Sequence, residues 1–194
     1  MISPRMCAAF YKAEYGGWFS KIIAGWTNSL HSHTETVFSR VATLDYLEML
    51  NQTSPQELEE LIFDSEPLGS SARLSFSASE RDGGVRFKLI GYEDKWDSIP
   101  FVDILGNYIS RETEADMITW CSKFVGRGYD YVGLLGFLIQ KLPLIKQNPK
   151  KFWCSETTEM VAHKLSMLDR APEPPSPGAL YDRMTAAGAV RMTQ

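Results

Sequence analysis

The sequence predicts an α+β fold in which helices flank a small antiparallel sheet or half-barrel. Runs of strand-forming residues and segments with apolar side chains at helical spacing both occur along the chain. Asp82-Gly83-Gly84 separates two of the strand-forming runs and is a hairpin signal, so these two strands are expected to be antiparallel. The 194 residues suit one domain with a hydrophobic core, expected to span residues 1–194.

Four strands are predicted from local runs of strand-forming residues. The first is closed by Gly16-Gly17, and the last two are joined by the Asp82-Gly83-Gly84 turn. The predicted strands cover residues 7–11, 34–41, 73–78 and 85–92.

Helices are predicted where apolar residues recur every three or four positions. Ser54-Pro55-Gln56-Glu57 is a start signal, because Ser can cap a helix and Pro suits the first helical position. It begins the second of two short helices that form a predicted helical insertion at about 44–63. The predicted helices cover residues 18–26, 44–50, 55–63, 113–125, 154–168 and 179–187, the last of them after an extended linker at 172–177.

Composition and charge exclude several classes of function. A net charge of −4 argues against broad nucleic-acid binding, which needs a basic surface, and no nucleic-acid motif occurs. No apolar run reaches the length of a membrane span, and the first residues lack the pattern of a signal peptide. We therefore expect a protein made in the cytoplasm, without a transmembrane segment.

The cysteines are few and widely spaced. Cys7, Cys121 and Cys154 are an odd number, and no two of them have the spacing of metal ligands. A disulfide framework and a structural zinc site are therefore not expected. No cofactor or metal is predicted.

Cys154 is the strongest candidate for chemistry because it lies where a loop enters a helix. On the first turn of a helix, unpaired backbone N–H groups and the positive end of the dipole favour thiolate over thiol. The same N–H groups could form an oxyanion hole. The alternative is an inert core thiol, which is the role expected of Cys7 and Cys121.

His33 lies at the start of a predicted strand, before Thr36-Val37-Phe38. Since side chains alternate along a strand, His31, His33 and Glu35 are expected to share one face. Glu35 could then accept a hydrogen bond from the His33 imidazole and hold its tautomer. The alternative for Glu35 is a solvated carboxylate.

Four segments, spread from about Ala8 to Leu180, carry a resemblance. They are Trp26-Thr27-Asn28-Ser29 with Ser32-His33-Thr34-Glu35-Thr36-Val37-Phe38, then Gly128-Tyr129-Asp130-Tyr131-Val132-Gly133, Phe152-Trp153-Cys154-Ser155-Glu156 and Ser176-Pro177-Gly178-Ala179-Leu180. In this order they resemble the circularly permuted branch of the papain-like superfamily. That branch includes NlpC-type cell-wall hydrolases, lecithin:retinol acyltransferase relatives and phage-encoded members, and the stretch 77–86 is similar to a segment of the last group.

The resemblance implies a role for each matching residue. Cys154 would be the nucleophile and His33 the general base, with Tyr129 and Ser155 supporting the nucleophile or the oxyanion. Relatives often take the third residue from the strand that follows the His strand after a short hairpin. Here the predicted helices at 44–63 intervene, so Glu35 is the expected third member and Ser77 the alternative.

The resemblance implies a thiol hydrolase that acts on peptide or amide bonds in peptidoglycan. An acyl hydrolase or acyltransferase acting on lipids is a second possibility, with a peripheral membrane contact through 133–151, where apolar residues precede several lysines. A core helix followed by a solvated basic loop is the alternative for that stretch, and it is the favoured one. A third possibility is a non-catalytic binding or virion structural module on the same fold, and virion association is expected if the protein is phage-encoded.

Overall fold

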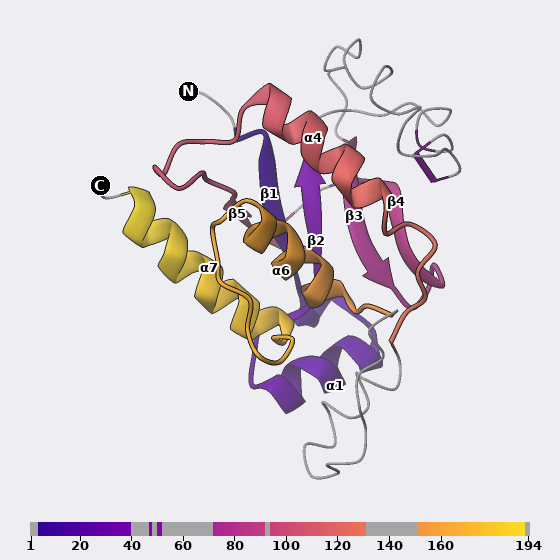
Figure 1. Ribbon diagram of the computed structural model, residues 1–194. Coiled ribbons are helices and arrows are strands. Elements are labelled where there is room, and N and C mark those ends of the chain that lie inside the picture. The colour runs from indigo at the N-terminus through magenta and orange to yellow at the C-terminus, as the bar shows by residue number, and fades with distance from the viewer. Residues whose placement is uncertain are drawn as a thin grey trace.

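The computed structural model describes residues 4–39, 47, 50–51, 72–91, 94–130 and 151–192. At its centre lies a five-stranded antiparallel sheet with the strand order β4-β3-β2-β1-β5 (Figure 1). The strands are β1 (Met6–Lys12), β2 (His31–Phe38), β3 (Ala72–Ser79), β4 (Gly84–Gly91) and β5 (Trp96–Pro100). The predicted α+β class with a small antiparallel sheet is confirmed at this level.

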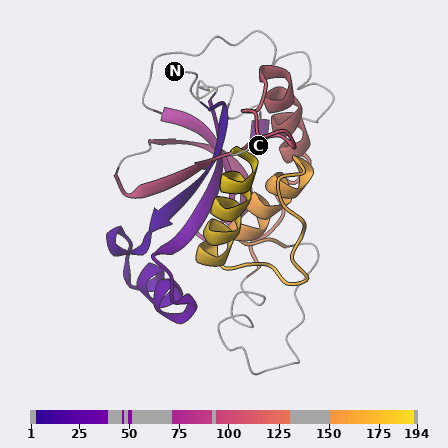
Figure 2. The same cartoon turned by 90° about the vertical axis from the view of Figure 1, so that its left-hand side faces the viewer.

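The helices are arranged asymmetrically around the sheet. Figure 2 shows α4 (Arg111–Ser122), α6 (Cys154–Lys164) and α7 (Pro177–Met192) on one side of the sheet, and no helix in the described part of the chain covers the other face. A short 3-10 helix and α1 lie beyond the end of the sheet at which β2 begins (Figure 1). The helices are η1 (Ala13–Tyr15), α1 (Trp18–Thr27), α4 (Arg111–Ser122), α6 (Cys154–Lys164) and α7 (Pro177–Met192). Among the helices described, none is both long and apolar enough to cross a membrane.

The strand register divides the sheet into an apolar and a polar face. Residues paired across antiparallel strands share a face, and Phe10 pairs with Thr34 while Phe76 pairs with Phe87. This face is buried beneath the helices, where Thr34 meets Thr158 of α6. The opposite face carries His33, Glu35 and, two strands away, Lys88.

His31 does not share a face with His33, so that part of the prediction is wrong. Tyr11 lies opposite His33 and Lys12 lies opposite His31, which leaves Ser32 as the extra residue of a β-bulge. The bulge turns the His31 ring to the helix side of the sheet, where it stacks on Tyr181 of α7 with ring centroids 4.4 Å apart. His31 Nε2 also lies 2.9 Å from a carboxylate oxygen of Asp97 on β5.

Several boundaries differ from the predicted ones. The strand predicted at 34–41 is β2, which begins three residues earlier because pairing with β1 continues past the bulge. The helix predicted at 113–125 begins at Arg111, where Ser110 accepts a hydrogen bond from the Thr113 N–H and caps it. The helix predicted at 154–168 ends at Lys164, and the last predicted helix is longer at both ends. β5 was not predicted, and the insertion at 44–63 lies almost entirely outside the described residues.

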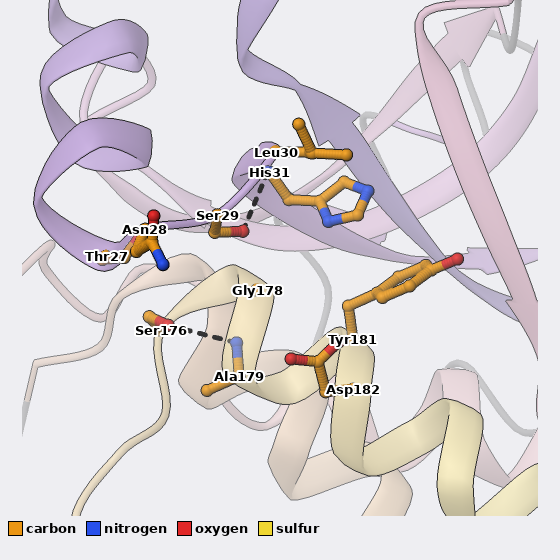
Figure 3. Close-up of a pocket in the computed structure, with 10 residues that line it drawn as sticks. All are labelled: Thr27, Asn28, Ser29, Leu30, His31, Ser176, Gly178, Ala179, Tyr181 and Asp182. Carbon is orange, nitrogen blue, oxygen red and sulfur yellow. Dashed lines mark hydrogen bonds between the residues drawn. The ribbon is translucent and has the colours of Figure 1, made fainter.

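A cavity of about 310 Å³ marks the seam between the end of α1 and the start of α7 (Figure 3). Ser176 caps α7 by accepting a hydrogen bond from the Ala179 N–H. Ser29 faces this turn, and its Oγ accepts a hydrogen bond from the His31 N–H. A Cβ added to Gly178 would lie 2.0 Å from that Oγ, so the close approach of the two segments requires glycine.

Replacing Gly178 with Ala should therefore destabilise the fold. The new methyl group would overlap Ser29, and relieving such overlap costs about 1–3 kcal/mol in the free energy of unfolding. Urea denaturation measures the difference. Gly25→Ala, in α1, is the matched control because its Cβ would meet nothing within 4 Å, and it should leave the stability unchanged or raise it. Equal stabilities of the two variants would contradict the proposed close packing.

Candidate active site

Cys154 is the first residue of α6, as the sequence predicts. The preceding Trp153 has extended backbone dihedrals, φ −109° and ψ 172°, so the chain changes direction immediately before the thiol. Cys154 is only 6 % exposed. The backbone N–H of Ser155, on the same first turn, is directed at the sulfur. The thiol thus occupies the position at which unpaired helix N–H groups stabilise negative charge.

A glycine on β4 positions the segment that precedes Cys154. Gly84 has φ +153°, and a Cβ there would lie 2.1 Å from the Arg127 carbonyl oxygen. The absence of a side chain lets the Arg127 carbonyl accept a 2.8 Å hydrogen bond from the Val85 N–H. The chain then continues to Tyr129, which forms a bridge with Phe152. The β3–β4 hairpin therefore fixes the backbone two residues before Cys154.

The sheet opens beside the thiol. β2 and β3 pair only through Thr36–Phe76 and Val37–Ser75 in the part of the sheet that the structure describes. Beyond this point the Thr34 carbonyl accepts a 2.9 Å hydrogen bond from the Ser77 hydroxyl, and the Thr34 N–H is directed at Cys154. Since both backbone groups of one residue point to the same side of a strand, the thiol occupies the gap between β2 and β3.

His33 and Glu35 form the second part of the site. The Nε2 atom of His33 lies 3.1 Å from Oε1 of Glu35, as expected for neighbours on one strand face. The Glu35 side chain is completely buried, which excludes the alternative of a solvated carboxylate. Because Nε2 is engaged with Glu35, Nδ1 is the ring nitrogen left to face Cys154. The side chain of His33 is 26 % exposed, so the imidazole, unlike the Glu35 carboxylate, is accessible from the cleft that it lines.

The electrostatics favour a thiolate–imidazolium pair. Burial alone would lower the pKa of His33, but Cys154 and Glu35 raise it to about 9. Burial alone would raise the pKa of Cys154, but the His33 charge and hydrogen bond, together with the backbone N–H groups of Thr34 and Ser155, lower it below its ordinary value. These opposite shifts are the pattern of an activated nucleophile and its base.

A lysine that the sequence reasoning missed completes the cluster. The Lys88 Nζ lies 2.5 Å from Oε1 of Glu35, the same oxygen that His33 contacts. These two cations outweigh the effect of burial and lower the pKa of Glu35 to about 2. The second carboxylate oxygen, Oε2, is buried and has no hydrogen-bond partner among the described residues. No local pattern links Lys88 to Glu35, because the contact spans two strand pairings.

The remaining predicted residues have different positions. Tyr129 is buried and lines the same cleft as Cys154 and His33. The Ser155 hydroxyl donates a 2.6 Å hydrogen bond to the Pro175 carbonyl, so only its backbone N–H faces the thiol. Ser77, the alternative third member, donates to the Thr34 carbonyl, whereas Glu35 contacts His33.

His33, Glu35, Tyr129 and Cys154 line one cleft with a volume of about 740 Å³. One part of its wall is aromatic, formed by Tyr11, Tyr15 and Trp96, and another part is charged, formed by Glu80, Arg81, Asp82, Lys88 and Lys95. The described residues include no cluster of His, Cys, Asp or Glu side chains suited to a metal ion. The cleft therefore offers polar and aromatic contacts around an activated thiol.

The other two cysteines lack this environment. Burial raises the pKa of Cys7 to about 11, despite the nearby Arg73. Burial also raises the pKa of Cys121 well above its ordinary value, and its side chain packs in the core. Both agree with the packing roles predicted for them.

Glu35→Gln should change the acid sensitivity of the fold. The Glu35 pKa of about 2 lies below its ordinary value of 4.5, so the ionised carboxylate stabilises the fold above about pH 4.5, and this contribution is lost as the pH falls toward 2. The variant should lose on the order of 3 kcal/mol at pH 7, because two cations lose their buried partner. The difference from the parent should shrink below about pH 4.5. Urea denaturation between pH 7 and 3 tests this, with exposed Glu173→Gln as control; a difference independent of pH would contradict it.

Comparisons with protein-family models, with curated proteins and with solved structures found no significant match for this chain. The relationship to the permuted papain-like branch therefore stays a prediction from the sequence. The geometry of Cys154, His33 and Glu35 is the observation from which a function can be inferred.

Proposed function

We propose that the protein is a thiol hydrolase that cleaves an amide or ester bond through an acyl-enzyme. The observation that carries this proposal is Cys154 at the start of α6, in contact with a His33 ring whose other nitrogen is held by Glu35. A nucleophile, a base within reach of it and a group that orients the base are the components that such catalysis requires.

In the first half-reaction the Cys154 thiolate attacks the carbonyl carbon and a carbon–sulfur bond forms. The negative charge moves to the carbonyl oxygen, which backbone N–H groups of the first turn of α6 can bind, with Tyr129 beside them. When the tetrahedral intermediate collapses, the bond to the leaving amine or alcohol breaks. The leaving group takes the proton of the His33 imidazolium, so Cys154 becomes a thioester and His33 becomes neutral.

In the second half-reaction neutral His33 takes a proton from water. The resulting hydroxide attacks the thioester, the carbon–sulfur bond breaks, and a carboxylic acid leaves. The thiolate and the imidazolium are restored. Another nucleophile in place of water would give a transferase by the same steps.

The preferred substrate in this proposal is a peptide or amide bond of the kind found in peptidoglycan. The sequence resemblance motivates this choice. The cleft supports it, because charged side chains such as Arg81, Asp82 and Lys88 suit a polar substrate better than an acyl chain.

Lipid-directed acyl hydrolysis is the second candidate, favoured by the apolar surface next to the cleft. Trp18, Ile22 and Trp26 follow one another at helical spacing on α1 and are exposed, as is Leu30 beyond it. Tyr15 is exposed and also lines the cleft. Parallel assays with peptidoglycan fragments and with phospholipid vesicles separate the two candidates. Of the stretch 133–151, for which a peripheral membrane contact was one possibility, residues 133–150 lie outside the described residues.

Alkylation by iodoacetamide tests the activated thiol directly. Cys154 should react at neutral pH, faster than Cys7 and Cys121, whose pKa values are raised by burial. His33→Ala should raise the apparent pKa of Cys154 and slow its alkylation near pH 7. Mass spectrometry assigns the rate at each site, so the two other cysteines are internal controls within one molecule.

Cys154→Ala should lower turnover of a cleaved substrate by about 1,000-fold or more while leaving the fold intact. Full activity in this variant would exclude the mechanism. If Cys154 is alkylated no faster than Cys7, and if His33→Ala leaves its alkylation rate unchanged, a non-catalytic binding module is favoured instead.

A further inference from the structure

We propose that Lys88 is a positioning residue of this site: its ammonium group balances the Glu35 carboxylate when His33 is neutral, so that His33 can release and regain its proton. This inference rests on the proposed function, since it assigns a role in the catalytic cycle. It differs from the established geometry of nucleophile, base and orienting acid by adding a second cation on another strand.

The contact geometry makes Lys88 and His33 competitors for one oxygen. The Lys88 Nζ and the His33 Nε2 lie 2.5 Å and 3.1 Å from Oε1 of Glu35. Two cationic groups that touch one atom lie within about 6 Å of each other, a separation at which like charges destabilise one another. Lys88 therefore stabilises the carboxylate and at the same time opposes the imidazolium.

The burial of Glu35 gives this second cation its importance. Glu35 is completely buried, and burial strongly disfavours a lone carboxylate. After acylation the thiolate is consumed and His33 has given its proton away. Without Lys88, the only charge left in the cluster would be the Glu35 carboxylate, which would hold a proton on His33 or take one itself. With Lys88, Glu35 keeps a counter-ion in both states.

The net charge of the four groups is the same in the two states of the cycle. In the resting state the groups alternate in sign: the Cys154 thiolate, the His33 imidazolium, the Glu35 carboxylate and the Lys88 ammonium. The cluster is neutral in this state. It is also neutral in the acyl-enzyme with neutral His33, where only Glu35 and Lys88 are charged. Without Lys88 both states would carry a net negative charge at the buried Glu35 carboxylate, so Lys88 supplies the counter-charge in both states.

Other titratable groups also face the cluster. Tyr11 on β1, Tyr129 before α6 and Lys95 before β5 line the same cleft. Asp82, at the β3–β4 turn, has its pKa lowered chiefly by Arg86 and less by Lys88. Of these groups, Lys95 adds a second lysine charge to the cleft, which makes it the matched control for Lys88.

The test measures the His33 titration in the full chain carrying Cys154→Ala. This substitution removes the thiolate and so reproduces the charges of the acyl-enzyme. The imidazole proton signals are followed by NMR against pH, and the His33 signal is assigned by its loss in His33→Ala. Lys88→Met should move the His33 midpoint up by about one pH unit, because the opposing charge is gone. Lys88→Arg should stay close to the reference, and so should Lys95→Met.

A merely structural Lys88 would not move this midpoint. A midpoint unchanged by Lys88→Met, or moved equally by Lys95→Met, overturns the proposal. Lys88→Gln provides a second neutral variant if Lys88→Met does not fold, and the same midpoint decides the outcome.

A second readout uses p-nitrophenyl acetate as an ester probe in chains that retain Cys154. Lys88→Met should accumulate the acetyl thioester on Cys154, seen as added mass, and release acetate about ten-fold more slowly than the parent. Equal release by the two chains contradicts the proposal. If the parent itself is never acetylated at Cys154, the proposed function fails, whereas the NMR titration still decides the charge role of Lys88.

Discussion

Backbone groups that leave a sheet ladder must find other partners, and at Thr34 this requirement shapes the whole candidate site. β3 turns away from β2 beyond Thr36, which frees the carbonyl and the N–H of Thr34 on that side. The Ser77 hydroxyl donates a hydrogen bond to this carbonyl, and the Thr34 N–H is directed at the Cys154 sulfur. The gap between β2 and β3 therefore exposes an N–H group that can stabilise a Cys154 thiolate. Because Cys154 is the first residue of α6, the helix must begin at this gap.

One face of β2 packs into the hydrophobic core, and the other face carries residues of the candidate site. On one face Phe38 is buried among aromatic core residues, which supplies favourable apolar burial. On the other face Glu35 is buried as a charge, which is costly even when paired. A strand in the middle of the sheet, held by β1 along its whole length, can tolerate that cost where an edge strand could not.

Local patterns predict the parts of this molecule that depend on local physics. The β3–β4 hairpin follows from the Asp82-Gly83-Gly84 turn, and the start of α6 follows from a loop that precedes periodic apolar residues. β5 is not predicted because Trp96–Pro100 is short, contains the poor strand former Asp97 and ends in proline, so its strand conformation depends on pairing with β1. The burial of Glu35 and its contact with Lys88 could not be predicted from the sequence for a related reason. They depend on the pairing of β2, β3 and β4, which brings together Glu35 and Lys88 from positions about fifty residues apart in the sequence, and side-chain alternation alone cannot predict that pairing.

In the β3–β4 turn, the residues that set the backbone path differ from the residues whose side chains line the cleft. Gly83 and Gly84, both at positive φ, set the path of the turn, while Glu80 and Arg81 project from it at the mouth of the cleft. The backbone that fixes Tyr129 and Cys154 depends on the glycines and on β4, not on the identity of the exposed side chains. The charges at this part of the cleft can therefore be exchanged by substitution while Cys154 and His33 keep their positions. In the proposed enzyme, the turn side chains could tune selectivity independently of the Cys154 thiol on α6 and the His33 imidazole on β2.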